Sequence, residues 1–206
     1  MIKDKANIAV LVSGGGTNLQ ALIDAQNNGI ITSGRIVLVI SNNDKAYALE
    51  RARGAGIKSA VIMKKDCRGQ SEFEEKIIDM LEEADIDLII LAGFMSILSK
   101  DFTGRYPERI INVHPSLIPS FCGEGFYGLH VHEAALEKGV KVSGATVHFV
   151  NEIPDGGRII AQKAVYVEEN DTPKSLQRRI MEQAEWIILP QAAEKICSEI
   201  IKDQAL

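Results

Sequence analysis

The chain is poor in cysteine and contains no long apolar run. Its three cysteines, Cys67, Cys122 and Cys197, are odd in number and lack the spacing of a zinc site, which argues against a disulfide framework and against structural zinc. No apolar stretch approaches the roughly 20 residues that span a membrane. Residues 1–5 lack the apolar core of a signal peptide. We therefore expect a cytoplasmic protein with reduced thiols.

The sequence also lacks an excess of positive charge. It has 23 Lys and Arg residues against 28 Asp and Glu residues, a net charge of −5. Such a chain has no general electrostatic attraction to nucleic acid or to an anionic membrane, although a local phosphate site is compatible with it. With 46% hydrophobic and 25% charged residues, the composition is typical of a soluble globular enzyme. We expect one domain, residues 1–206, with small-molecule substrates; composition leaves the oligomeric state open.

Strand-like apolar segments alternate with helical patterns over the first half of the chain. The strands are expected at 6–12, 35–41, 59–63 and 87–93, and the helices near 17–23, 46–55 and 71–84. The last of these strands is apolar on both faces, as in the middle of a parallel sheet. This alternation predicts crossover units and an α/β fold with a doubly wound, mostly parallel, Rossmann-like sheet.

The pattern changes after Ser116. The expected elements are a loop at 117–129, a short helix at 132–138 and strands at 141–150 and 158–167. The two strands are joined by a turn that contains Asp155-Gly156-Gly157, which favours an antiparallel hairpin or near-hairpin toward the C-terminus. A C-terminal helix begins after Thr172 and runs toward Ile201, and Pro190 is expected to kink or break it.

A glycine-rich turn follows the first expected strand. Gly14, Gly15 and Gly16 allow the backbone to approach a ligand closely, and a helix beginning near Thr17 would present free N–H groups and its positive dipole end to an anion. This indicates a phosphate site. Leu19 stands where a dinucleotide fingerprint has its third glycine, and no Gly-Lys-Ser/Thr follows, so neither standard nucleotide loop fits. A tight turn without a ligand is the alternative.

Asn112 and His114 leave the end of an apolar run two residues apart. In a strand, side chains at this spacing share a face, and Pro115 ends the strand. Together they would offer an imidazole and a neutral hydrogen-bond donor at the carboxyl edge of the sheet, where open α/β sheets place ligands. A buried carboxylate would raise the pKa of His114 and orient the ring, and Asp155 is our choice. The alternative is that Asn112 caps a turn and Asp155 satisfies hairpin backbone.

The remaining histidines are weaker candidates for chemistry. His148 lies in an apolar run, and we expect it to be a satisfied sheet or core residue. His130 and His132 have the spacing of neighbours on one face of a strand, but no third metal ligand accompanies them. We therefore expect no metal site.

Four motifs together resemble one family of enzymes. They are Ser13-Gly14-Gly15-Gly16-Thr17-Asn18-Leu19-Gln20, Leu91-Ala92-Gly93-Phe94-Met95-Ser96-Ile97-Leu98, Asn112-Val113-His114-Pro115-Ser116-Leu117-Ile118-Pro119 and Asp155-Gly156-Gly157. Over almost its whole length the chain resembles the phosphoribosylglycinamide formyltransferases, which belong to the folate-dependent formyltransferase superfamily. The resemblance implies transfer of a formyl group from 10-formyltetrahydrofolate to the amine of glycinamide ribonucleotide, in purine biosynthesis.

The resemblance also implies roles for individual residues. Asn112, His114 and Asp155 form the catalytic set, in which Asn112 and a protonated His114 stabilise a tetrahedral oxyanion. The residues implied to bind the substrate are Gly16, Thr17 and Asn18, at its phosphate, and Glu185, at its ribose. The residues implied to bind the folate are Met95, Ser96, Ile97, Leu98, Arg68, Asn151, Glu152, Ile153 and Pro154.

The sequence departs from the family pattern at three places. Ser96 and Gln70 stand where relatives carry arginine, and Arg68 is a candidate substitute. The segment 121–127 is longer than in relatives, and the C-terminal helix holds one extra residue within 181–184. The first difference affects the predicted contacts to the folate, and the second affects the conformation of the loop. The third affects the assignment of Glu185, which follows the extra residue.

Three other functions fit parts of the pattern. A formyltetrahydrofolate deformylase would use water in place of the amine, but it typically has an N-terminal regulatory domain, and none fits before Ala6. A methionyl-tRNA formyltransferase usually has a C-terminal domain for its acidic partner, and this acidic chain is expected to end too early for one. A non-enzymatic nucleotide-binding module would need only the glycine-rich turn.

Overall fold

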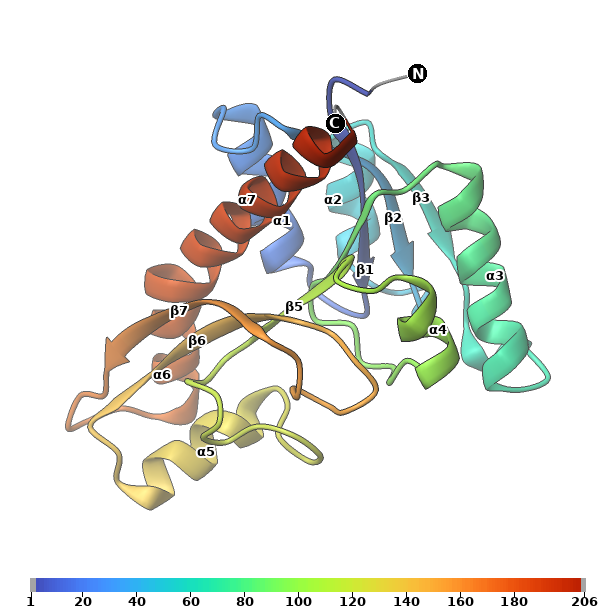
Figure 1. The fold of residues 1–206 in the computed structure, drawn as a ribbon. Coiled ribbons are helices and arrows are strands. Elements are labelled where there is room, and N and C mark those ends of the chain that lie inside the picture. Colours follow the sequence, from blue (N-terminus) through green and yellow to red (C-terminus); the bar gives the residue numbers. More distant parts are fainter. Residues whose placement is uncertain (1–2, 205–206) are drawn as a thin grey trace.

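The computed structural model describes residues 3–204 and shows seven strands in one sheet, in the order β3-β2-β1-β4-β5-β6-β7 (Figure 1). β1 to β5 are parallel, whereas β6 and β7 are each antiparallel to the strand before. The strands are β1 (Ala6–Val12), β2 (Gly34–Ser41), β3 (Lys58–Val61), β4 (Leu88–Leu91), β5 (Ile110–His114), β6 (Val142–Phe149) and β7 (Ile159–Tyr166). The predicted fold class is confirmed.

Helices cover both faces of the sheet. They are α1 (Thr17–Asn27), α2 (Ala48–Gly54), α3 (Gln70–Glu83), α4 (Lys100–Arg105), α5 (Leu129–Lys138), α6 (Pro173–Ile180) and α7 (Trp186–Gln204). One buried cluster joins the sheet to α1, α2, α5, α6 and α7, and a second joins it to α3 and α4. The short helix α4 was not predicted; its start is stabilised by Ser99, whose hydroxyl accepts a hydrogen bond from the Phe102 N–H.

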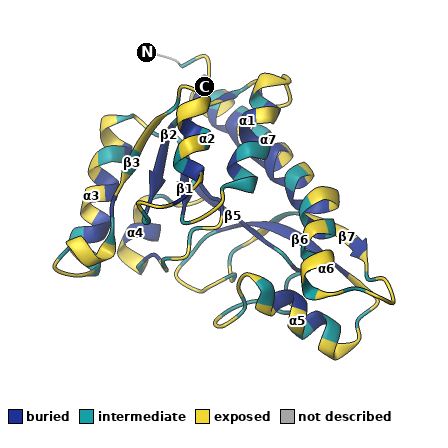
Figure 2. Cartoon of the chain, turned by 180° about the vertical axis from the view of Figure 1, so that it is seen from behind, coloured by how far each residue is buried: buried dark blue, intermediate teal, exposed yellow. Residues whose placement is uncertain are grey.

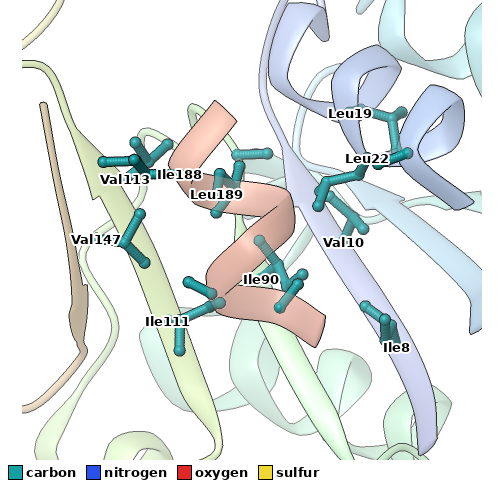
Figure 3. Packing of buried hydrophobic residues seen from close by; sticks show 14 of the residues in the cluster. Ile8, Val10, Leu19, Leu22, Ile90, Ile111, Val113, Val147, Ile188 and Leu189 are labelled. Atoms are coloured by element: carbon teal, nitrogen blue, oxygen red, sulfur yellow. The ribbon is translucent and has the colours of Figure 1, made fainter. Parts of the chain in front are cut away.

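The core lies against the central strands. All seven residues of β1 are buried, as expected for a strand covered by helices on both faces. Figure 2 shows buried residues concentrated on the central strands, whereas the edge strands β3 and β7 are mostly exposed. In Figure 3, Ile90 and Ile111 of neighbouring strands face α7, which carries Leu189, and all three residues are fully buried. The C-terminal helix thus contributes directly to the main core.

The C-terminal helical segment has one irregular turn. A π-helical turn, Met181–Glu185, joins α6 to α7. This turn lies at 181–184, where one extra residue was predicted, and a π turn holds one residue more than an α turn. Pro190 was expected to kink or break the helix, and α7 does not break there but continues through this residue. The departure from α-helical geometry lies one turn earlier.

The order of the strands reverses next to β1. The chain after β1 leads to β2 on one side, and β4 pairs with the other side of β1. In doubly wound sheets the crevice at such a switch point, outside the carboxyl ends of the strands, is the usual ligand site. Both the glycine-rich turn and the end of β5 lie at these carboxyl ends. Within residues 3–204, none of the helices is long and apolar enough to cross a membrane.

Candidate active site

Three polar side chains share one face at the end of the sheet. Asn112 and His114 are two residues apart on β5, and the register of the antiparallel pair places Asn112 opposite His148 of β6. Residues directly opposite in such a pair project to the same side. His114 and His148 are buried, whereas Asn112 is half-buried. The sheet therefore presents two imidazoles and a carboxamide together.

The loop between β6 and β7 adds a carboxylate to this group. Asp155 adopts a positive φ of 56° in front of two glycines, a conformation in which aspartate is tolerated better than most residues. Its Oδ2 lies 3.4 Å from Nδ1 of His114, and its Oδ1 lies 3.4 Å from Nε2 of His148. The structure thus brings Asn112, His114 and Asp155 together from distant parts of the chain.

His148 links two members of this set. Its Nδ1 lies 2.8 Å from the Phe149 carbonyl oxygen, which can only accept, so Nδ1 carries a hydrogen. In the neutral ring, Nε2 then accepts a hydrogen bond from Nδ2 of Asn112 at 3.2 Å, which orients the carboxamide. The sequence analysis predicted a buried sheet histidine but missed this contact. The signal lay in the pairing register of β5 and β6, which no local pattern reveals.

The pKa of His114 is lower than its usual value, contrary to our expectation. Burial disfavours the charged ring, and this effect exceeds the opposing influence of Asp155 and of the Phe121 carbonyl. The predicted rise in pKa is therefore wrong. At neutral pH the resting ring is neutral and available as a proton acceptor.

Asp155 is the ionised partner of that ring. Burial alone would raise its pKa, but the neighbouring His148, the hydrogen bond from the Gly123 N–H and the nearby His114 lower it. A carboxylate that stays charged beside a neutral imidazole stabilises the imidazolium once a proton arrives. The pair is suited to moving protons rather than to holding one permanently.

The pH dependence of activity should report this lowered pKa. Because His114 must be neutral to accept a proton, we expect kcat/KM to fall on the acid side with a midpoint below 6.5. The measurement is a profile of initial rates against pH at low substrate concentration, with protein folding monitored at each pH by circular dichroism. A midpoint above 6.5 would contradict a neutral resting His114.

The glycine-rich turn forms a tight corner at the start of α1. Gly16 has a φ of +71°, and a Cβ there would lie 2.6 Å from Cβ of Ala48, so both conformation and space require glycine. Thr17 is the first residue of α1, an 11-residue helix whose free N–H groups face the crevice edge. This geometry is compatible with the phosphate site predicted from the sequence.

The π turn brings a fourth predicted residue to this corner. Glu185 is buried and accepts a hydrogen bond of 2.7 Å from Nδ2 of Asn18. Burial raises the pKa of Glu185 to about 7, and the bond from Asn18 opposes this only in part. The Oδ1 of Asn18 is buried and has no hydrogen-bond partner among the described residues. Gly16, Thr17, Asn18 and Glu185 are therefore brought together, with acceptor capacity left for a bound molecule.

Glu185 should make stability depend on pH. Because its pKa is raised in the fold, the native state binds the proton more tightly, and stability falls as pH rises from the usual value of 4.5 through about 7. We expect Glu185→Gln to exceed the wild type in free energy of unfolding at pH 8 by up to about 3 kcal/mol. Urea unfolding at pH 8 and at pH 4 measures this, and the gap should close at pH 4. An equal gap at both pH values would mean that ionisation is not the cause.

A cleft beside the catalytic set is walled by two loops. One follows β4 and the other joins β6 to β7. The lining residues include Ser96, Ile97, Leu98, Asn112, His148, Asn151, Glu152, Ile153, Pro154 and Asp155. Seven of the nine predicted folate-binding residues therefore lie in this cleft. Met95 is more than half exposed outside the lining, and the Arg68 side chain is 97% exposed beside Glu72.

The two departures from the arginine pattern have structural roles here. Nε2 of Gln70 donates to the Ile97 carbonyl oxygen at 3.1 Å. Nδ2 of Asn42 donates to the hydroxyl of Ser96 at 2.9 Å. Neutral side chains thus anchor one wall of the cleft, whereas the side chain of Arg68, the candidate substitute for the missing arginine, is 97% exposed outside its lining.

The remaining histidines lie outside this group. His130 is exposed and bonded to Glu133 at 3.0 Å. His132 is fully buried in α5, with neither ring nitrogen bonded to a described residue, and burial lowers its pKa to about 4. Among residues 3–204, no cluster of three His, Cys, Asp or Glu side chains has the arrangement of a metal site.

Comparison with known proteins identifies the family. The formyl transferase family matches residues 6–193. Phosphoribosylglycinamide formyltransferase of Haemophilus influenzae is 44% identical, over 89% of this chain and 83% of its own length. The human trifunctional purine biosynthetic protein adenosine-3 is also 44% identical, over 97% of this chain, but the match spans only 19% of that larger protein.

A solved structure agrees with the sequence comparison. Glycinamide ribonucleotide transformylase 1 from Symbiobacterium toebii superposes with a TM-score of 0.89 at 41% identity, covering 95% of this chain and 89% of that one. At this level of identity, sequence and fold support the same assignment. The chain belongs to the phosphoribosylglycinamide formyltransferase family.

Proposed function

We propose that this chain transfers a formyl group from 10-formyltetrahydrofolate to the amine of glycinamide ribonucleotide. The observation that carries the proposal is the convergence of an imidazole, a carboxamide and a carboxylate between a cleft and a helix N-terminus. Acyl transfer to an amine needs a proton acceptor, an oxyanion donor and two binding sites that meet. In the same proposal, residues 1–206 form a single cytoplasmic domain whose partners are small molecules.

The substrate lies along the corner between α1 and the π turn. Its phosphate accepts from the backbone around Gly16, Thr17 and Asn18, where the helix dipole favours an anion. Its ribose hydroxyls bond to Glu185, whose carboxyl group is already oriented by Asn18. The amine then extends toward the end of β5.

The donor lies in the cleft between the two loops. Its heterocycle packs against the apolar side chains of Ile97, Leu98 and Ile153, and its formyl group faces the polar end formed by Asn112 and Asp155. Exclusion of water from this end favours transfer over hydrolysis.

The chemical step starts with attack of the amine on the formyl carbon. The carbonyl oxygen becomes an oxyanion, and the Nδ2 group of Asn112 donates to it. The amine loses a proton to Nδ1 of His114, and Asp155 stabilises the resulting imidazolium. The carbon–nitrogen bond to the folate then breaks, and the imidazolium returns the proton to the departing nitrogen. Formylated product and tetrahydrofolate result, with His114 neutral again.

The test is a direct assay with both substrates. Purified protein, 10-formyltetrahydrofolate and glycinamide ribonucleotide should yield equal amounts of tetrahydrofolate and a product heavier by one formyl group, measured by absorbance and mass spectrometry. A second reaction without the amine distinguishes the deformylase alternative. Rapid release of formate in that reaction, or no turnover with both substrates, would overturn the proposal.

A further inference from the structure

One short loop segment contacts both members of the proton-transfer pair. We define the anchor segment as residues 121–123, within the loop between β5 and α5. The Phe121 carbonyl oxygen lies 2.8 Å from Nε2 of His114. The Gly123 N–H donates to Oδ2 of Asp155 at 2.8 Å. Backbone groups two residues apart therefore hold the imidazole and the carboxylate at once.

The first contact determines which nitrogen of His114 is basic. A carbonyl oxygen can only accept, so the ring places its hydrogen on Nε2. In the neutral ring the lone pair then lies on Nδ1, the atom that faces Asp155 at 3.4 Å. If the Phe121 carbonyl moved away, the hydrogen would shift to Nδ1 to meet the carboxylate, and the ring would present no basic nitrogen on that side.

The second contact acts on the carboxylate. The Gly123 N–H bonds to Oδ2, the same oxygen that faces Nδ1 of His114. Its donation favours the charged carboxylate and restrains its rotation. The anchor segment thus sets both the tautomer of one partner and the orientation of the other.

The conformation of the segment is held from several sides. Phe121 has a φ of +50°, which is unusual for a bulky residue, and Gly123 has a φ of +87°. The Phe121 ring packs on the main core and meets the ring of Phe126 edge to face, with 6.3 Å between centroids. The Cys122 thiol donates to the Pro119 carbonyl oxygen at 3.3 Å. A strained backbone persists only where surrounding contacts maintain it.

We propose that the anchor segment is a positioning element for the transfer reaction. Through two backbone hydrogen bonds it selects Nδ1 of His114 as the proton acceptor and fixes the carboxylate of Asp155 beside it. This inference rests on the proposed function, since it assigns a role within that reaction. The anchor segment is the first part of the stretch 121–127, which is longer than in relatives. The inference therefore gives this longer loop a role in the reaction.

Two glycines of the same loop provide a matched test. Gly123 and Gly125 have almost equal φ values, +87° and +88°, and, their chain neighbours aside, no atom of residues 3–204 lies within 4 Å of a Cβ built on either. Only Gly123 bonds to Asp155. Alanine at either position therefore imposes the same backbone strain, but only Gly123→Ala should displace a contact to the reacting groups.

We expect Gly123→Ala to lower kcat by about 10²-fold. The KM values should change by less than about threefold, because the segment is not part of either proposed substrate site. Gly125→Ala should lower kcat by less than about threefold. Gly123→Asn should recover part of the loss, since asparagine tolerates positive φ better than alanine. Thermal unfolding of each variant checks that the fold is kept.

A second measurement does not depend on activity. The ¹⁵N shifts of His114, assigned by comparison with His114→Ala, should show the Nε2–H tautomer in the wild type and a shift toward Nδ1–H in Gly123→Ala. Equal loss of kcat in the two alanine variants, or an unchanged tautomer in Gly123→Ala, would overturn the inference. Failure of the wild type to transfer formyl would instead overturn the proposed function, and the tautomer measurement would still decide the role of the segment.

Discussion

In the Asp155→Asn variant, kcat for formyl transfer is expected to fall by about 10³-fold. Asparagine has nearly the same shape, but it has no charge to stabilise the imidazolium of His114, whose Nδ1 lies 3.4 Å from the carboxylate. Because His114 already has a lowered pKa, the loss of this charge makes proton uptake harder still. Single-turnover rates with both substrates saturating measure the chemical step directly.

The pair should also behave as a unit. We expect His114→Ala to be impaired as strongly as Asp155→Asn, and the double variant to be little worse than either, because each single change already disables the proton path. His130→Ala is the control, since His130 is exposed and bonded to Glu133 outside the site. Near-normal turnover of Asp155→Asn, or additive losses in the double variant, would show that the two residues act separately.

The second large effect is expected at Gly157, two residues after Asp155 in the loop between β6 and β7. An alanine Cβ at Gly157 would lie 1.7 Å from the carbonyl oxygen of Phe149. The obstructing atom is backbone of β6, so no side-chain rotation relieves the clash, and the turn between β6 and β7 has to move. We expect Gly157→Ala to destabilise the protein by about 3 kcal/mol or more and to displace Asp155 from His114. Urea unfolding and the single-turnover rate measure the two consequences.

Gly104 gives the matching control for that substitution. It lies within α4, and, apart from its chain neighbours and the backbone of α4, no atom of the described residues is within 4 Å of a Cβ built there. Gly104→Ala should raise the free energy of unfolding by up to about 1 kcal/mol, because alanine favours a helix over glycine. If Gly157→Ala were as stable as Gly104→Ala, then the turn would be more adaptable than its close backbone contact indicates.

The parts predicted correctly from the sequence depend on local patterns. Alternating apolar segments were enough for the order of elements, and the spacing of Asn112 and His114 placed both on one face of β5. The resemblance to the family predicted an extra residue within 181–184, and a π turn lies at this segment. Asp155 was chosen as the carboxylate partner of His114, and the resemblance implied the same role, although no local pattern connects it to the end of β5.

The parts that were missed depend on contacts between distant segments. His148 joined the site through the register of two strands, which is set by the whole sheet. The pKa of His114 was predicted to be raised, because only the effect of the carboxylate was considered. It is lowered instead, because burial of the ring outweighs that effect. Arg68 and Met95 lie outside the lining of the cleft, and Gln70 and Asn42 bond to residues of its wall, which are contacts that no local pattern reveals.

The π turn has a consequence for how chains of this family can change length. An α-helix advances by about 100° per residue, so one added residue would ordinarily rotate everything after it. Ile187, now 38% exposed, would then replace the buried Ile188 against the sheet. Because a π turn holds one residue more than an α turn, a residue added there does not rotate the helix that follows. The orientation of Glu185 in the turn is therefore independent of the orientation of the apolar residues in α7. The segment that carries Glu185 can therefore change in length without repacking the apolar residues of α7 against the sheet.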